Sequence, residues 1–155
     1  MLLTLRKAKY EDLIKTYTWA NDQEVIKNSI ERSNKVSLKE HLEWFNKYIN
    51  SKSKTLIIAS FKNQKIGLVR MDLNKKDYFI SYLVDKKKRR KGFGYEMLKK
   101  IIEKYKLTKN NFKARVKKNN YASNSIFLKL GFKIKYTNNN KKIILYELRN
   151  HNAKN

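Results

Sequence analysis

The stretch from Tyr78 to Lys100 restricts the possible fold more than any other part of the chain. It reads YFISYLVDKKKRRKGFGYEMLKK, which is an apolar run, a block of six basic residues, a Gly-x-Gly and an amphipathic segment. The apolar run predicts a buried strand, and the helical spacing of the later apolar residues predicts a helix. A strand that passes through a glycine-containing loop into a helix indicates a domain that mixes helices with a sheet.

The same stretch favours an anion site at the start of its helix. Gly92 and Gly94 lack side chains, so backbone N–H groups can approach a ligand closely. A helix N-terminus adds free N–H donors and a partial positive charge, and Arg89, Arg90 and Lys91 add cations beside it. A pyrophosphate would fit there. The plain alternative is a tight turn before a solvated basic helix; Walker and dinucleotide-binding patterns are both incomplete.

The rest of the pattern predicts an α/β or α+β domain with a mixed, mostly antiparallel sheet of about seven strands and four helices. The length suits one hydrophobic core, and we expect residues 1–149 to form a single domain, followed by a disordered tail over 150–155. We expect strands over 2–6, 55–61, 65–73, 78–84, 112–116, 133–136 and 143–148, and helices over 10–20, 38–49, 92–105 and 121–130.

The helix expected over 38–49 has a clear start and two candidate inner faces. Ser37 and Glu40 have the spacing of a capping box. Leu38, Leu42, Phe45 and Ile49 recur at helical spacing and predict the buried stripe, while His41, Trp44 and Tyr48 form a second line beside it.

The net charge of +25 has two interpretations. It favours a polyanionic partner such as nucleic acid, an anionic membrane or a phosphate-rich ligand, or it reflects a composition rich in lysine, asparagine and isoleucine throughout. Because the lysines are scattered over every segment, we assign most of the charge to composition. The block over 86–91 is the exception, since specific glycines follow it.

Several kinds of site and location are excluded or disfavoured by composition. There is no cysteine, which excludes disulfides, thiolate metal sites and a cysteine nucleophile. His41 and His151 are the only histidines, so we expect no metal site. No apolar run reaches about 18 residues, and the first residues do not form a signal peptide, so we expect a cytoplasmic protein without a membrane span.

A second stretch carries another pattern, Ala-x-Val, Asn-x-x-Ser, an aromatic residue and Lys-x-Gly-Phe. Together with Arg89-x-x-Gly92-x-Gly94, it resembles the GNAT superfamily of N-acetyltransferases, whose coenzyme A loop reads Arg/Gln-x-x-Gly-x-Gly/Ala. The resemblance implies the GNAT fold and transfer of an acetyl group from acetyl-CoA to a primary amine. The residues of the second pattern are Ala114, Val116, Asn120, Ser123, Phe127, Lys129, Gly131 and Phe132.

The resemblance also implies where coenzyme A lies. The strand before the basic loop splays from its neighbour, the pantetheine arm pairs with the backbone at Leu83 and Val84, and an N–H of one of these is the oxyanion donor, which we assign to Val84. The pyrophosphate lies against 89–95. The implied coenzyme A contacts are Leu83, Val84, Arg89, Arg90, Lys91, Gly92, Phe93, Gly94, Tyr95, Asn120, Ser123, Phe127 and Lys129.

One position departs from the family pattern. Many members have a tyrosine at Phe127, where it protonates the leaving thiolate, and phenylalanine has no proton to give. Tyr121, Ser125 or a water could serve instead, or the thiolate could leave without an acid, since thiol pKa values lie near 8.5. The candidates for the base that takes the amine proton are His41, Asp72, Asp77 and Glu43, with Ser81 and Tyr82 as possible water holders and a structural role as the plain alternative for His41.

The acceptor is suggested by two further elements. Trp19-Ala20-Asn21-Asp22 and His41-x-x-Trp44-Phe45 resemble those of GNAT enzymes that acetylate amino-sugar nucleotides, closest to the pseudaminic-acid-pathway type. This implies a UDP-linked amino sugar of surface-glycan or flagellin-sugar biosynthesis as substrate, and family dimers imply a possible homodimer. Ribosomal-protein N-terminal acetylation and a basic nucleic-acid-binding module remain as alternatives. The implied substrate contacts are Trp19, Asn21, His41, Trp44 and Ser81.

Overall fold

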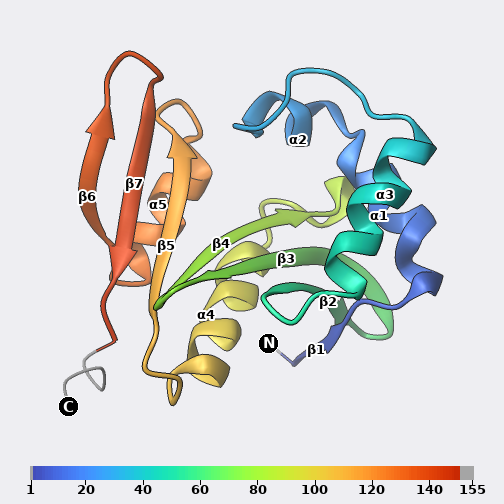
Figure 1. The fold of residues 1–155 in the computed structure, drawn as a ribbon, viewed down its shortest axis with the longest axis horizontal. Coiled ribbons are helices and arrows are strands. Elements are labelled where there is room, and N and C mark those ends of the chain that lie inside the picture. The colour runs from blue at the N-terminus through green and yellow to red at the C-terminus, as the bar shows by residue number, and fades with distance from the viewer. Residues whose placement is uncertain (1, 151–155) are drawn as a thin grey trace.

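The computed structural model describes residues 2–150, which form one seven-stranded sheet with helices on both faces (Figure 1). The strand order is β1-β2-β3-β4-β5-β7-β6, and all neighbours are antiparallel except β4 and β5, which are parallel. The predicted mixed sheet and its strand count are therefore confirmed. The strands are β1 (Leu3–Lys7), β2 (Lys54–Phe61), β3 (Gln64–Asn74), β4 (Asp77–Val84), β5 (Asn111–Lys117), β6 (Lys133–Asn138) and β7 (Ile143–Leu148).

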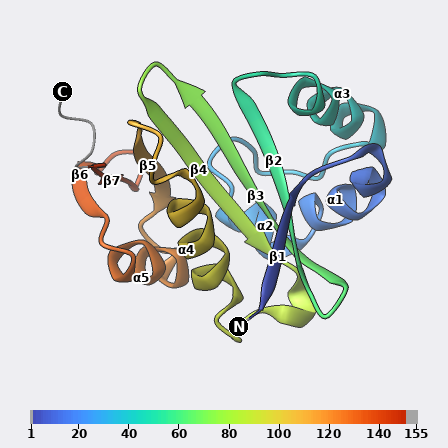
Figure 2. The ribbon, with the colours of Figure 1, turned by 90° about the horizontal axis from the view of Figure 1, so that it is seen from below.

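Two layers of helices cover the sheet (Figure 2). One core lies between the sheet and α4 and α5, and a second lies under α1 and α3. No helix within the described range is long and apolar enough to cross a membrane. The helices are α1 (Leu13–Ala20), α2 (Gln23–Asn28), α3 (Leu38–Ile49), α4 (Phe93–Tyr105) and α5 (Tyr121–Lys129), with short 3-10 turns η1 (Tyr10–Asp12) and η2 (Lys86–Lys88).

The prediction of four helices is wrong by one, because α2 was missed. This helix has only six residues, too few to show an apolar repeat. Its start signal is nevertheless in the sequence, since the Asp22 carboxylate accepts hydrogen bonds from the N–H groups of Glu24 and Val25. The helix predicted over 10–20 also differs at its start, which is the 3-10 turn η1.

The predicted inner face of α3 is right for Phe45 and Ile49 and wrong for its two leucines, and the predicted capping box is confirmed. Ser37 and Glu40 exchange side-chain and backbone hydrogen bonds at the helix start. Leu38 and Leu42, however, are 44% and 37% exposed. Phe45 of the predicted stripe is buried together with His41 and Tyr48 of the second line, because these rings pack with Trp19 of α1 and the apolar residues of β2.

The predicted separation of β4 from its neighbour is present. Only Asp77–Phe79 of β4 pairs with β5, at Asn111–Lys113. Beyond that point β5 continues its pairing with β7, while β4 runs away from it (Figure 1). The segment 80–84 therefore faces a gap on its β5 side while its other edge stays paired with β3.

The chain end differs slightly from the expected boundary. Asn150, the first residue of the predicted tail, is anchored, since its side chain donates to the carbonyls of Lys106 and Thr108 and its N–H donates to Asn111. The remaining tail residues, 151–155, lie outside the described part of the chain.

Candidate functional site

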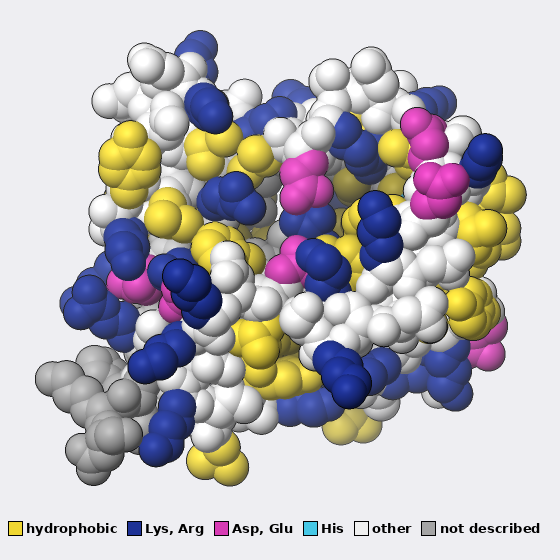
Figure 3. All heavy atoms as spheres, viewed as in Figure 1, with side chains coloured by type: hydrophobic (Ala, Val, Ile, Leu, Met, Phe, Trp, Pro, Cys, Tyr) yellow, Lys and Arg dark blue, Asp and Glu magenta, His cyan; other side chains and the backbone are white. Residues whose placement is uncertain are grey.

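A cavity of about 680 Å³ follows the gap between β4 and β5 and reaches both faces of the sheet. Figure 3 shows the hollow on one face, with acidic side chains inside a ring of lysines and arginines. Successive side chains of β4 point to opposite faces, which joins the two halves of the cavity. We call the two halves of the cavity the α4 side and the α3 side. The α4 side is lined by Tyr82, Gly92, Gly94, Ser123, Ile126 and Phe127. The α3 side is lined by Glu31, His41, Trp44, Arg70, Asp72 and Ser81.

The N-terminus of α4 is open toward a ligand. Its N-cap is Gly92, with φ of 78° and ψ of −2°, and no side chain caps the helix. Glu96 makes the first intrahelical bond back to Gly92, so the N–H groups of 93–95 are left for an anion. Arg90 also has a positive φ of 59°, which turns the loop before the helix. Backbone conformation therefore leaves an uncapped helix start at the position of the predicted anion site.

The two glycines of the loop have different reasons to be glycine. At Gly92 an added Cβ would meet nothing within 4 Å, so its role is the left-handed backbone conformation. At Gly94 an added Cβ would lie 2.8 Å from the Tyr82 ring and 3.2 Å from Ile126. Gly94 therefore lets α4 pack tightly against β4 and α5. The reason predicted from the sequence, close approach of a ligand to the backbone, is a different one.

The backbone of β4 presents N–H groups to the gap at alternate residues. Asp85 donates its N–H to Ile66 of β3, so by strand alternation Leu83 and Ser81 also face β3. Val84 and Tyr82 then direct their N–H groups toward the gap. Of the two predicted backbone positions, Val84 has the free donor and Leu83 contributes its side chain to the core under α3.

The described residues fit coenzyme A. The gap offers an unpaired strand edge for the amides of the pantetheine arm, and the open α4 N-terminus offers N–H donors for the pyrophosphate. Arg90 adds a cation at the cavity wall. Three predicted contacts, Lys91, Tyr95 and Lys129, lie outside the cavity lining.

The Arg89 side chain is engaged with α2. Its Nε donates to the Val84 carbonyl at 3.1 Å, Nη1 donates to Glu24 at 3.0 Å, and Nη2 donates to Asp22 at 2.5 Å. Burial acts to raise the Asp22 pKa, but the hydrogen bond and charge of Arg89, together with the N–H groups of Val25 and Glu24, hold it below its usual value. The predicted pyrophosphate contact is therefore paired with two carboxylates in the structure.

A hydroxyl pair that the sequence argument missed lies beside Phe127. The Phe127 ring is buried at the cavity wall, with the Tyr82 ring edge-on at 6.1 Å. The Tyr82 hydroxyl is 2.9 Å from Ser123 Oγ, and burial raises the Tyr82 pKa. Tyr121, predicted as a possible acid, is 79% exposed and outside the lining. The alternation of side chains along β4 could have indicated this pair, because it places Tyr82 on the face toward α5 and Ser81 on the opposite face.

Asn120 has a structural role at the start of α5. Its side-chain oxygen accepts the N–H of Ser123 at 3.3 Å, which is an N-cap bond. Both residues also line the cavity. The Asn-x-x-Ser pattern therefore begins α5 and brings the Ser123 hydroxyl to the Tyr82 hydroxyl.

His41 is a buried, neutral histidine. Its Nε2 lies 2.9 Å from Thr16 Oγ1, and that hydroxyl gives its only proton to the Leu13 carbonyl. His41 Nε2 must therefore be the donor. Burial, together with the positive charge of Arg32, lowers the His41 pKa to about 4. A ring with that pKa is a poor base for an ammonium group, so the geometry gives His41 a packing and hydrogen-bonding role.

Trp19 and Asn21 connect elements and do not line the cavity. The buried Trp19 donates its Nε1–H to Asp85 at 2.8 Å, and Asn21 exchanges two hydrogen bonds with the backbone of Val36. Burial acts to raise the Asp85 pKa, but hydrogen bonds from Trp19 and Lys15 outweigh it and lower this pKa to about 2. The predicted substrate role of these two residues has no support in their contacts.

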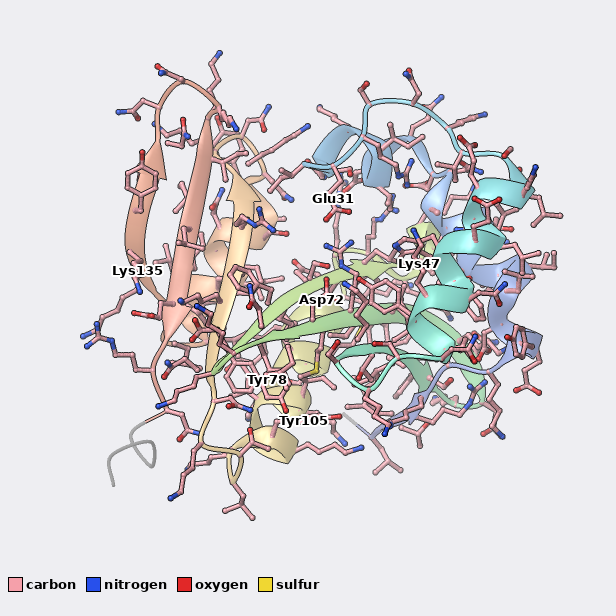
Figure 4. All side chains as sticks on the ribbon, viewed as in Figure 1. Glu31, Lys47, Asp72, Tyr78, Tyr105 and Lys135 are labelled. Carbon is pink, nitrogen blue, oxygen red and sulfur yellow. The ribbon has the colours of Figure 1, made fainter. Side chains whose placement is uncertain are left out.

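Charged residues of β3 lie on the floor of the α3 side. Arg70 pairs with Ser81 and Asp72 pairs with Phe79 across the β3–β4 ladder, so their side chains share a face. Both Nη groups of Arg70 donate to Glu31 at 2.9 Å, and Figure 4 shows Glu31 above Asp72 on this face. Asp72 Oδ1 is buried and makes no hydrogen bond of ordinary geometry within the described residues, although the Tyr48 hydroxyl interacts with this carboxylate and Oδ2 lies 3.8 Å from Arg70 Nε. The Asp72 side chain as a whole is 25% exposed at the cavity wall, so its carboxylate is within reach of a ligand.

The other two candidate bases lie away from this floor. Asp77 accepts hydrogen bonds from Asn111 and Lys113 where β4 and β5 first pair, and Glu43 is on the exposed face of α3. Neither lines the cavity. Within residues 2–150, no group of three or more histidine, aspartate or glutamate side chains is arranged to hold a metal ion.

The fold is shared with solved acetyltransferase structures. The aminoglycoside acetyltransferase AAC(6')-Ib in complex with coenzyme A superposes with a TM-score of 0.82 at 17% identity, covering 98% of this chain and 96% of that one. Spermidine N-acetyltransferase from Vibrio cholerae gives 0.80 at 17% identity, covering 94% and 92%. RimL, a ribosomal-protein alpha-N-acetyltransferase, gives 0.84 at 15% identity, covering 98% and 96%. Identities this low establish the fold alone.

Sequence comparison establishes the family. No curated protein matches the sequence significantly. The family model described as "Acetyltransferase (GNAT) domain" matches residues 3–133, which include the α4 loop, the separated strands and the pattern through Phe132. The chain therefore belongs to the GNAT acetyltransferases and is an N-acetyltransferase that uses acetyl-CoA as its co-substrate.

Proposed function

We propose that the acceptor is the primary amine of an amino sugar carried on a nucleoside diphosphate, of the UDP-linked type used in surface-glycan or flagellin-sugar biosynthesis. The observation that carries the proposal is the partly exposed carboxylate of Asp72 on the floor of the α3 side. A primary amine can donate an N–H to this carboxylate. A sugar amine with a pKa near 8 is partly neutral at pH 7, so it needs orientation more than a strong base.

The walls around Asp72 suit a ring-shaped small molecule. Trp44 and Phe79 line the cavity and offer aromatic surfaces for a sugar ring. The Arg115 guanidinium lies 5.4 Å from the centre of the Phe79 ring, where it can meet a diphosphate. The Glu31–Arg70 pair joins the segment before α3 to β3 and narrows access, which favours a small acceptor over a folded protein.

The chain's own groups can support the transfer in three ways. The Val84 N–H faces the gap and can stabilise the oxyanion that forms when the amine attacks the thioester carbonyl. Asp72 can accept a hydrogen bond from the amine and orient it. The hydroxyl pair of Tyr82 and Ser123 can supply the proton that the departing thiolate needs, in place of a tyrosine at Phe127. A cytoplasmic location remains part of this proposal.

An acceptor panel tests the proposal. Release of the coenzyme A thiol would be followed with acetyl-CoA and, in turn, a UDP-4-amino sugar, an aminoglycoside, spermidine and a peptide bearing the N-terminus of a ribosomal protein. We expect the UDP-4-amino sugar to give the highest kcat/KM, at least tenfold above the others. Faster turnover of the peptide would favour N-terminal acetylation, and faster turnover of the aminoglycoside or spermidine would exclude the nucleotide as a recognised group.

A further inference from the structure

The Arg89 guanidinium and its partners have a net negative charge. Three of its N–H groups donate within the protein, two of them to the carboxylates of Asp22 and Glu24. One cation between two anions sums to −1. Such a group does not attract a diphosphate, whereas the neighbouring Arg90 has an exposed side chain at the cavity wall. Arg90 and the α4 N-terminus are therefore better placed to meet the pyrophosphate.

The acids that hold Arg89 belong to a wall of the cavity. Asp22 caps α2, and its carboxylate serves both the helix N–H groups and Arg89. Glu24, Val25 and Asn28 of α2 line the cavity, and the chain then leads to Glu31 over the α3 side. The chain has only 13 acidic residues against a net charge of +25, and two of them bind Arg89. These two contacts hold the short helix α2 in place.

A second connection secures the same corner. Asp85, at the start of the loop that carries Arg89, accepts hydrogen bonds from Trp19 and Lys15 of α1. It also caps η2 by accepting the N–H of Lys87. The loop before α4 is thus joined to α1 through Asp85 and to α2 through Arg89, four residues later.

We infer that Arg89 is a positioning residue for the acceptor half of the site: it holds α2 against the loop before α4 and leaves the pyrophosphate to Arg90 and the helix N-terminus. Acceptor recognition then depends on Arg89 more strongly than coenzyme A binding does. The two arginines are adjacent in sequence but serve opposite halves of the cavity.

The first test needs no acceptor. Arg89→Ala and Arg90→Ala would each be compared with the wild type by calorimetric titration with coenzyme A and by hydrogen exchange of residues 23–28. We expect Arg89→Ala to speed exchange in α2 at least tenfold and to change the coenzyme A Kd less than threefold. Arg90→Ala should weaken coenzyme A at least fivefold and leave α2 exchange unchanged. Weaker coenzyme A binding by Arg89→Ala with unaltered α2 exchange would overturn the inference.

Two further arms separate positioning from general destabilisation. The Asp22→Asn/Glu24→Gln double variant should reproduce the α2 exchange of Arg89→Ala, and adding Arg89→Ala to it should cause little further change. Additive effects would contradict the pairing. With the UDP-4-amino sugar, an arm that rests on the proposed function, Arg89→Ala should raise the acceptor KM at least tenfold with kcat within threefold. If the wild type does not turn over this sugar, the proposed function fails while the exchange result still decides the role of Arg89.

Discussion

The two sides of the cavity are built from different kinds of group. The α4 side depends on backbone: an unpaired strand edge at 80–84, a left-handed Gly92 and an uncapped helix start. The α3 side depends on side chains from distant segments, such as Glu31 with Arg70 and His41 with Thr16. Backbone groups are present whatever the side chains are, so the α4 side can always recognise the same acyl donor, acetyl-CoA. Side-chain pairs can change singly, so the α3 side can be adapted to a particular acceptor.

The largest expected effect tests what supports the α3 side. Phe45→Ala should lower the free energy of unfolding by about 3–5 kcal/mol, because Phe45 is fully buried among Trp19, Tyr48 and Leu56. Denaturant unfolding would measure it. Leu42→Ala, one turn away on the exposed face of α3, is the matched control and should stay within about 0.5 kcal/mol. Equal losses of stability in the two variants would show that the Leu42 side of α3 is buried as well.

His41 should make the α3 side sensitive to acid in a defined window. Its folded pKa of about 4 lies below the ordinary histidine value of 6.5, so the neutral ring is favoured in the fold. The neutral His41 ring makes its full contribution to the free energy of unfolding above pH 6.5. This contribution is lost as the pH falls toward 4, by about 3 kcal/mol in total. Asp12 and Asp85 have folded pKa values of about 2 against ordinary values of 3.8, so the stability they add is lost mainly below pH 4, under this window.

Thermal melts between pH 7 and pH 4 would measure this loss. His41→Gln should flatten the curve over that range while its stability at pH 7 falls. A pH dependence that is unchanged in His41→Gln would show that another group causes it. Because His41 is not the base, the pH profile of kcat over pH 6–7 should be the same in the wild type and in His41→Gln.

The α4 side should tolerate backbone change poorly at Gly94 and better at Gly92. Gly94→Val places atoms against the Tyr82 ring, so it should cost about 1–3 kcal/mol of stability and weaken coenzyme A. Gly92→Ala meets open space and pays only for its positive φ, about 1 kcal/mol. Thermal unfolding with a coenzyme A titration would rank them. A larger loss for Gly92→Ala would mean that conformation, and not packing, limits this loop.

The smallest expected effect is the most selective. Asp72→Asn keeps the shape of the side chain but removes the charge and replaces one acceptor oxygen by a donor. We expect kcat/KM for the amine to fall about tenfold, which corresponds to about 1.4 kcal/mol, with the coenzyme A Kd within twofold. Steady-state kinetics and calorimetry would show this. A change in coenzyme A affinity instead would mean that the two sides are not independent at Asp72.

The sequence allowed the α4 side to be predicted well because its signals are local. The strand, the two glycines and the helix start follow one another within Tyr78 to Lys100, and the structure keeps that order. Even there, the reason for Gly94 is a contact with Tyr82, and the partners of Arg89 come from α2. Such contacts depend on packing between segments that the local pattern does not describe.

The α3 side was predicted less well for the same reason. The resemblance predicts Trp19, Asn21 and His41 as substrate contacts, but each side chain is hydrogen-bonded to a residue far along the chain: Asp85, Val36 and Thr16. The recurrence of Leu38, Leu42, Phe45 and Ile49 at helical spacing predicts an inner face that the two leucines do not join. A hydrogen bond to Thr16 and the surrounding aromatic rings bury His41 despite its polarity. Asp72 was among the predicted residues, and only the fold distinguishes it from Asp77.

Hydrogen exchange with and without coenzyme A tests the central claim most directly, because that claim concerns backbone N–H groups. The account predicts slower exchange in peptides covering 80–84 and 92–95 when coenzyme A is added, with no change over 38–49 in α3. Coenzyme A binding without protection of either 80–84 or 92–95 would contradict the account of the α4 side.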